Sequence, residues 1–182
     1  MEEKKVYIGN DTAGFYLKSK CIEYLDGKHI PYVDCGSADD PDIEATRYPF
    51  FAAKVAKAVA SGEARCGLLI CGTGIGISMA ANKFKGIRAG LCSTTYDAVM
   101  TRRHNNANIL CMGGKTTGEW IAIEILDAFL KTPYDGGFHD GSLDLIADME
   151  AAMMNDAVWA QEPRKISTGL LADAEIFDRS KG

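Results

Sequence analysis

Gly67-Leu68-Leu69-Ile70-Cys71-Gly72-Thr73-Gly74-Ile75-Gly76-Ile77-Ser78-Met79-Ala80-Ala81-Asn82 is the stretch that decides the fold of this chain. It opens on a short apolar run, which is typical of a buried parallel strand. Alternate glycines follow, and then an Ala- and Met-rich segment that can form a helix. A strand, a glycine turn and a helix in that order place free backbone N–H groups and the positive helix end at one point. The stretch therefore predicts an anion-binding turn, with Cys71 at its edge.

The glycine loop matches neither of the common nucleotide-binding patterns. It lacks the Gly-Lys-Ser/Thr that closes a P-loop, and no third glycine follows Gly76 at the spacing of a dinucleotide site. A cysteine phosphatase would need an Arg near the end of the loop, where this chain has Ile77. What remains is a small-anion or oxyanion site beside a thiol. The simpler interpretation is that the glycines only allow tight packing of strand against helix.

One cysteine differs in position from the others. Free cysteines are usually small buried hydrophobes, and five of the six are interpreted in this way. No C-x-x-C pair occurs, which favours reduced thiols over disulfides. Only Cys71 ends a strand before a helix N-terminus, where a thiolate is stabilised, so it could be a nucleophile or a general base. The cysteines are Cys21, Cys35, Cys66, Cys71, Cys92 and Cys111.

Strands and helices alternate along most of the chain. This alternation predicts βαβ units in an α/β fold: a Rossmann-like three-layer sandwich, with a five-stranded parallel sheet and helices on both faces. Ligands in such folds bind beyond the carboxyl ends of the strands, so the loops that follow those ends should converge. The predicted strands cover residues 6–9, 30–35, 66–71, 86–92 and 108–113, and the predicted helices cover 15–25, 48–60, the segment after the glycine loop, 94–103, 117–130 and 142–155.

Composition narrows the class of protein. The chain has 182 residues, 47% of them hydrophobic and 25% charged, which is ordinary for a soluble globular domain. A net charge of −5 without a basic stripe argues against nucleic-acid binding. The apolar runs are shorter than a membrane span and no signal peptide is visible, so we expect no membrane and a cytoplasmic location. Residues 1–155 form the predicted domain, and 156–182 a C-terminal extension that is either an arm on a partner subunit or disordered.

The three histidines have different settings. His29 lies in a turn and is expected to be inert. His104 belongs to a run of side-chain hydrogen-bond donors, residues 102–108, which is either functional or a solvated basic helix end. His139 follows a glycine pair and is either a phosphate donor or a surface residue. No pair of His, Cys or carboxylate residues has metal-ligand spacing, so the sequence predicts no metal site.

Five segments together carry a resemblance to one family. The chain resembles the ribose-5-phosphate isomerase B and galactose-6-phosphate isomerase family, in register from about residue 5 to 150. The most specific segment is the Cys-Gly-Thr-Gly-hydrophobic-Gly loop followed by Ala-Asn-Lys. The segments are Ile8-Gly9-Asn10-Asp11-Thr12-Ala13-Gly14, Thr46-Arg47-Tyr48-Pro49, residues 71–76 with 81–83, Gly86-Ile87-Arg88-Ala89 and Arg103-His104-Asn105-Asn106-Ala107-Asn108.

The resemblance implies an aldose–ketose isomerase without metal or cofactor, which moves a proton between C1 and C2 of a sugar phosphate through a cis-enediolate. Cys71 then looks like the base, Thr73 and the loop amides like the enediolate holders, and His104 like the ring-opening group. It also implies a homodimer, or a dimer of dimers, in which the histidine of one subunit faces the cysteine of the other. The expected substrate-binding residues are Asp11, Thr12, Tyr48, Gly72, Gly74, Ile75, Gly76, Asn105, Lys115 and His139.

Four positions depart from the family pattern. Thr12 stands where a substrate-binding His is usual, and Arg47 where an acidic residue is common. Phe138 and Ser142 replace two arginines that commonly grip the phosphate, and a charge-assisted clamp is among the strongest contacts of such a site. The phosphate is then held by other groups, such as His139, Lys115 or Arg103, or the substrate is different.

Ribose 5-phosphate and ribulose 5-phosphate are the nominal substrate pair. The alternatives within the class are galactose 6-phosphate, allose 6-phosphate or a tetrulose phosphate. Two alternatives belong to other functional classes: a non-catalytic sugar-phosphate sensor and a thiol redox protein. Joint retention of Cys71 and His104 speaks against the sensor. A thiol redox role is disfavoured because the sequence shows no resolving partner for Cys71.

Overall fold

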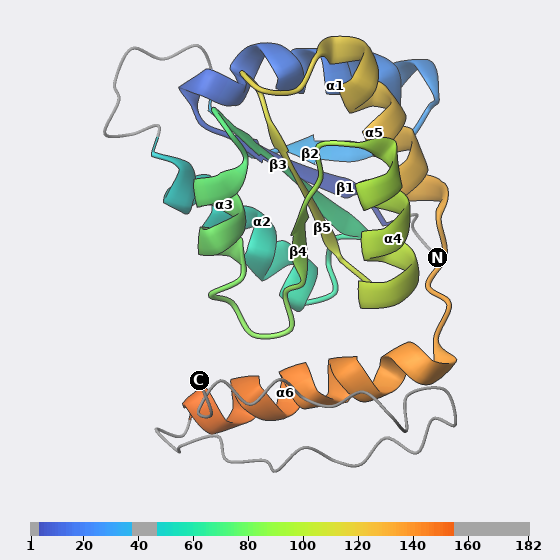
Figure 1. Cartoon of the computed structure of the whole chain (residues 1–182). Coiled ribbons are helices and arrows are strands. Elements are labelled where there is room, and N and C mark those ends of the chain that lie inside the picture. The colour runs from blue at the N-terminus through green and yellow to red at the C-terminus, as the bar shows by residue number, and fades with distance from the viewer. Residues whose placement is uncertain (1–3, 38–46, 155–182) are drawn as a thin grey trace, which may run out of the picture.

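The structure is a computed structural model, and it describes residues 4–37 and 47–154. The predicted C-terminal extension, 156–182, lies outside the described residues. The described chain forms a three-layer α/β sandwich (Figure 1), as the alternation of strands and helices predicts.

The middle layer is a sheet of five parallel strands in the order β2-β1-β3-β5-β4. Every residue of the central strand β3 is buried, because helices cover both faces of the sheet. β3 pairs with β1 and β5, so the strand that leads into the glycine loop lies at the centre of the sheet. The strands are β1 (Val6–Asn10), β2 (Tyr32–Asp34), β3 (Cys66–Cys71), β4 (Ala89–Leu91) and β5 (Ile109–Gly113).

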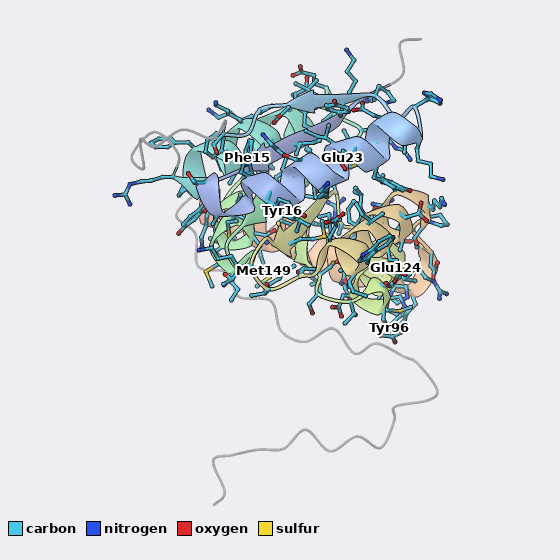
Figure 2. The ribbon with its side chains drawn as sticks, turned by 90° about the horizontal axis from the view of Figure 1, so that it is seen from above. Phe15, Tyr16, Glu23, Tyr96, Glu124 and Met149 are labelled. Atoms are coloured by element: carbon cyan, nitrogen blue, oxygen red, sulfur yellow. The ribbon has the colours of Figure 1, made fainter. Side chains whose placement is uncertain are left out.

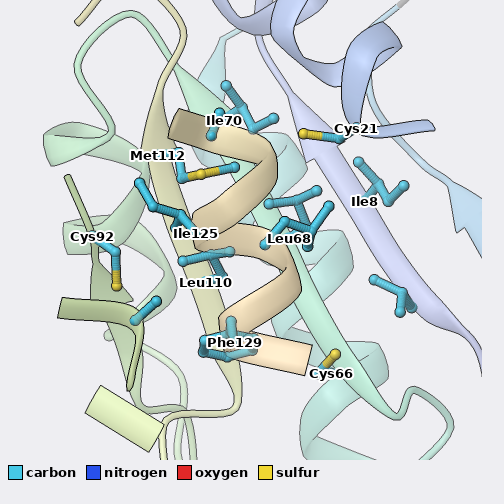
Figure 3. Packing of buried hydrophobic residues seen from close by; sticks show 14 of the residues in the cluster. Ile8, Cys21, Cys66, Leu68, Ile70, Cys92, Leu110, Met112, Ile125 and Phe129 are labelled. Atoms are coloured by element: carbon cyan, nitrogen blue, oxygen red, sulfur yellow. The ribbon is translucent and has the colours of Figure 1, made fainter. Parts of the chain in front are cut away.

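Alternate residues of β3 face the two helical layers. Leu68 and Ile70 pack with α1 (Phe15–Gly27), α4 (Thr95–Asn105) and α5 (Glu119–Lys131), which cover one face. Leu69 and Cys71 pack with α2 (Tyr48–Ala60) and α3 (Ile75–Ala81) on the other. Figure 3 shows the first of these clusters, with Leu68 and Ile70 beside side chains of α5.

Several predicted boundaries shift in the structure. The largest change is the predicted strand 86–92, which is reduced to β4. The Asn82 side chain bonds both backbone groups of Ala89, at 2.8 and 2.9 Å. The Arg88 amide donates to Asn108 Oδ1 at 2.8 Å. Side chains thus replace ladder hydrogen bonds around the start of this strand, and Gly86 turns with a φ of 76°. Likewise, the predicted strand 30–35 shortens to β2.

The last helix, α6 (Asp140–Met154), stands apart from the two helical layers. Residues 132–136 and a short 3-10 helix, η2 (Gly137–His139), connect it to α5. None of its described side chains is buried. It carries three exposed large apolar side chains: Ile146 (40%), Met149 (40%) and Met153 (72%). Met149 is labelled in Figure 2. Its apolar side therefore lacks a full partner among the described residues.

α6 does contact the body of the chain through Glu150. The Gly86 amide donates to Glu150 Oε2 at 3.0 Å. Small hollows between α6 and the segment 82–90 flank this contact. Among residues 4–37 and 47–154, no helix combines the length and the apolarity that are needed to cross a bilayer.

Candidate active site

The glycine loop begins at Cys71, the last residue of β3. The Cys71 side chain is only 5% exposed. Its Sγ accepts a hydrogen bond from the Gly74 amide at 3.2 Å, and its carbonyl accepts from the Gly114 amide at 2.7 Å. The thiol is therefore held at the carboxyl edge of the sheet by the loop that follows it and by the end of β5.

The loop has a shape that only glycine permits at Gly74. This residue has a φ of 76°, in the left-handed region, and it directly precedes α3. A Cβ atom there would lie 2.5 Å from Leu91 Cδ1 and 2.8 Å from the carbonyl carbon of Met112. The residues on either side of Gly74, Thr73 and Ile75, are both exposed. Thr73 Oγ1 accepts a hydrogen bond from the Ile75 amide at 3.3 Å. The loop thus presents Thr73 and the start of α3 to solvent.

Tyr48 lies against this loop from α2. A Cβ atom on Gly76 would come within 2.9 Å of the Tyr48 ring, so the ring and the loop backbone are in direct contact. Tyr48 is 38% exposed, and it is one of the predicted substrate-binding residues. It therefore lies directly beside the glycine loop.

Asp11 and Lys115 join the loop from β1 and β5. Asp11 Oδ1 accepts from the Gly14 amide at 3.0 Å, in the 3-10 turn η1 (Thr12–Gly14). Desolvation raises the pKa of Asp11, and hydrogen bonds from backbone amides and the charge of Lys115 oppose this. The Lys115 amide donates to the Gly72 carbonyl at 2.9 Å. Thr12 is exposed and begins η1. The next residue, Ala13, lies against the loop, since a Cβ atom on Gly72 would be 3.6 Å from its Cβ.

One half of the predicted site is thus brought together at the carboxyl edge of the sheet. The loops after β1, β3 and β5 converge there as the sequence predicts. The predicted residues in this half are Asp11, Thr12, Tyr48, Cys71, Gly72, Thr73, Gly74, Ile75, Gly76 and Lys115.

The other half lies at the opposite edge. His104 and Asn105 occupy the last turn of α4, and β5 starts only four residues after Asn105. α4 begins after the carboxyl end of β4 and runs back along the sheet for 11 residues, which is about 16 Å of helix. Asn105 shares a hollow with Asn82 and Ile87, in front of β4. Within one subunit, Cys71 and His104 are therefore at opposite edges of the sheet.

His104 is grouped with residues that the sequence did not place beside it. The ring of His139 stacks on the ring of His104, with centroids 4.3 Å apart and planes at 17°. Asp135 forms an ion pair with Arg103 at 2.9 Å, and its backbone amide donates to the Arg103 carbonyl at 3.1 Å. The Arg103 guanidinium lowers the pKa of Asp135, and positive charge on the two histidines would lower it further.

Asp135 is the neighbour of His104 that sequence reasoning missed. It lies in Pro133-Tyr134-Asp135-Gly136-Gly137, a composition typical of a turn. It is 31 residues from His104, so no spacing rule could connect the two. The signal that could have found it is its position four residues before His139.

This chain has no positively charged residue at the two positions where the family pattern has phosphate-binding arginines. Phe138 is 65% exposed and meets the His139 ring edge-on, with centroids 5.7 Å apart. Ser142 is also exposed. Arg103, a predicted alternative phosphate ligand, is paired with Asp135. The surface around His139 is therefore more aromatic and less positively charged than the family pattern implies.

Replacing Gly74 with alanine should unfold the protein more easily and impair the site. We expect a loss of about 2–4 kcal/mol in the free energy of unfolding, from the left-handed φ together with the clash at Met112. Activity should also fall, because relief of the clash displaces the Gly74 amide, which holds the Cys71 sulfur. Urea unfolding and an isomerase assay measure the two effects.

Gly86→Ala is the matched control for that variant. Gly86 has the same φ of 76°, but a Cβ atom there would meet nothing within 4 Å. It should cost only about 1–2 kcal/mol, from the conformation alone, and leave activity near wild type. Equal losses in both variants would contradict the role assigned to the loop.

Comparison with known proteins decides the family. The sequence profile of the Ribose/Galactose Isomerase family matches residues 6–146. The chain belongs to this family. Ribose-5-phosphate isomerase B of Escherichia coli (strain K12) is 44% identical over 147 residues, which cover 81% of this chain and 97% of that protein. The chain is thus a sugar-phosphate isomerase of the aldose–ketose class.

Other members of the ribose/galactose isomerase family extend the comparison. The 4-deoxy-4-sulfo-D-erythrose isomerase of Clostridium sp. (strain MSTE9) is 42% identical over 132 residues, covering 71% of this chain and 80% of that protein. The structure of ribose-5-phosphate isomerase B from Clostridium thermocellum superposes with a TM-score of 0.77 at 42% identity, covering 82% of this chain and 99% of that one. The family thus includes enzymes named for different sugars.

Proposed function

We propose that this isomerase interconverts an aldose phosphate and its ketose with Cys71 as the base, and that ribose 5-phosphate and ribulose 5-phosphate are the nominal pair. The Cys71 thiolate takes the proton from C2 of the open-chain aldose. The electron pair moves to the carbonyl oxygen and leaves a cis-enediolate, which Thr73 and the loop amides stabilise. A proton passes from the C2 hydroxyl to the C1 oxygen, and the thiol returns its proton to C1.

The observation that carries this proposal is the setting of Cys71. It is the cysteine at the carboxyl end of the central strand, and its sulfur is bonded to the loop amide of Gly74. Asp11 and Lys115 stand at the same edge, where they could bind sugar hydroxyls and an anionic group. Each step is a proton transfer, so we propose that it proceeds without metal or cofactor. The six free thiols support a reducing, cytoplasmic location.

We further propose that each active site is shared between two subunits of a homodimer, or of a dimer of dimers. Cys71 and His104 cannot reach one small sugar within a subunit, because the length of α4 separates them. Two subunits related by a twofold axis could bring the cysteine edge of one to the histidine edge of the other. The exposed apolar side of α6, next to η2 and His139, supplies a surface for that contact. His104 of the partner would then open the sugar ring.

A second candidate substrate is a sugar with a different chain length or a different terminal anion. Phe138 and Ser142, both exposed, put no positive charge where the family pattern has arginines. A phosphate dianion gains much from such a clamp, and a less charged group loses less without it. The relative from Clostridium sp. (strain MSTE9) is named for a sulfonated tetrose, which supports a sulfonate as a candidate terminal anion. Galactose 6-phosphate, allose 6-phosphate and tetrulose phosphates remain alternatives.

A substrate panel tests the proposal. The assay compares kcat/KM for ribose 5-phosphate, allose 6-phosphate, galactose 6-phosphate, erythrose 4-phosphate and 4-deoxy-4-sulfo-erythrose. We expect activity on at least one of them, and ribose 5-phosphate to lead if other cations replace the arginines. The variant Phe138→Arg should then favour phosphates over the sulfonate by at least about tenfold, since bidentate guanidinium contacts discriminate strongly. Activity on none would refute the proposed substrate class.

A further inference from the structure

The last turn of α4 and the segment before α6 bring together three side chains of types that can ligate metals. The ligand atoms of His104, Asp135 and His139 all lie within 4.8 Å of one another. Both histidines are half-buried, while Asp135 is exposed. The backbone bond from Asp135 to Arg103, at 3.1 Å, fixes the segment against α4. The three side chains therefore come from two elements that the fold holds together. The His139 ring stacks on the His104 ring with planes at 17°, so it must turn off that face for both rings to direct a nitrogen at one ion.

The donor set has a recognisable chemistry. Two imidazoles and one carboxylate suit zinc and the neighbouring divalent ions, whereas magnesium and calcium prefer oxygen ligands alone. Three protein ligands also leave a coordination position open for water or another group. We propose that His104, Asp135 and His139 bind one Zn²⁺ ion per subunit.

The Asp135 carboxylate keeps one oxygen available for the ion. Arg103 contacts Oδ2 through both Nε and a terminal nitrogen, each at 2.9 Å. Its contact with Oδ1 is longer, at 3.2 Å. Zn²⁺ can thus bind Oδ1 while the guanidinium stays on Oδ2. The positive charge of Arg103 repels the ion and weakens its binding. Arg103→Gln should therefore tighten zinc binding.

The ion would act on the reaction through His104. An imidazole bound to zinc has given up the lone pair that it needs to accept a proton. Zinc should therefore inhibit isomerisation of cyclic sugar phosphates more than that of open-chain ones. This consequence rests on the proposed function, whereas the binding itself does not.

Zinc titration of the full-length chain tests the site, by calorimetry or against a chromophoric chelator. We expect one ion per subunit in the wild type. Affinity should fall at least about tenfold in His139→Gln and in Asp135→Asn, because each removes one of three ligands. Unchanged affinity in these two variants would overturn the proposal.

Two further variants separate this site from other zinc ligands. His29→Asn removes an exposed imidazole elsewhere and suits the φ of 55° at that position, so its zinc affinity should match wild type. Cys71→Ser should also keep its affinity. Loss of binding in Cys71→Ser, or a cobalt–thiolate charge-transfer band when Co²⁺ replaces Zn²⁺, would assign the ion to the thiol and overturn the proposal.

Activity measurements then distinguish the two proposals. Asp135→Asn should remain active and should resist zinc at concentrations that inhibit the wild type. Zinc that binds at this cluster without slowing any cyclic substrate would leave the metal site in place and refute the ring-opening role of His104.

Discussion

Replacing Cys71 with serine is expected to lower kcat for isomerisation by about a thousandfold, the size of a typical general-base contribution. A serine hydroxyl is a far weaker base than a thiolate, although it fits the same space and can still accept the hydrogen bond of the Gly74 amide. Binding of the sugar phosphate should change little, because the other residues at that edge are untouched. The loss should therefore appear in kcat and not in KM.

Exchange of the substrate C2 proton with deuterated solvent, followed by NMR, reports the step directly. In Cys71→Ser this exchange should slow as much as turnover does. Cys35→Ser is a matched control, because Cys35 is a half-buried thiol that directly follows β2, the strand at one edge of the sheet, and has no assigned role. Turnover in Cys71→Ser equal to that of the control would rule out the proposed base.

Mixing two inactive variants should restore activity if the site is shared between subunits. Cys71→Ala and His104→Ala should each be nearly inactive on a cyclic substrate. After unfolding and refolding together, half of the dimers are mixed, and each mixed dimer has one site with both residues intact. The expected recovery is about a quarter of wild-type activity, as the symmetry of a twofold dimer requires.

The same mixture gives no recovery if the site lies within one subunit, since every subunit then lacks one of the two groups. Refolding each variant alone is the control for the procedure. Sedimentation of the wild type should also show a dimer or a dimer of dimers. Met149→Asp, on the exposed side of α6, should weaken that assembly, and unchanged assembly would argue against α6 as the contact surface.

Local patterns were enough to predict most of the fold. The apolar run of β3 and the glycines after it predicted a strand, a turn and a helix, and these are present. The errors lie at edges such as residues 86–92, where Asn82 and Asn108 take the backbone hydrogen bonds. A local sequence pattern does not show that a side chain elsewhere in the chain will take the backbone hydrogen bonds that a neighbouring strand would otherwise make. The strand at residues 86–92 was therefore predicted too long.

The sequence by itself determined the parallel sandwich and the place of Cys71, because periodicity, glycine conformation and the end of an apolar strand are properties of neighbouring residues. Only the tertiary structure decided that Cys71 and His104 lie at opposite edges, since the direction of α4 across the sheet sets that separation. It also decided that Asp135 and His139 meet His104. That contact depends on a backbone hydrogen bond between segments about thirty residues apart. Such a bond forms only when the chain folds, and residue spacing in the sequence does not reveal it.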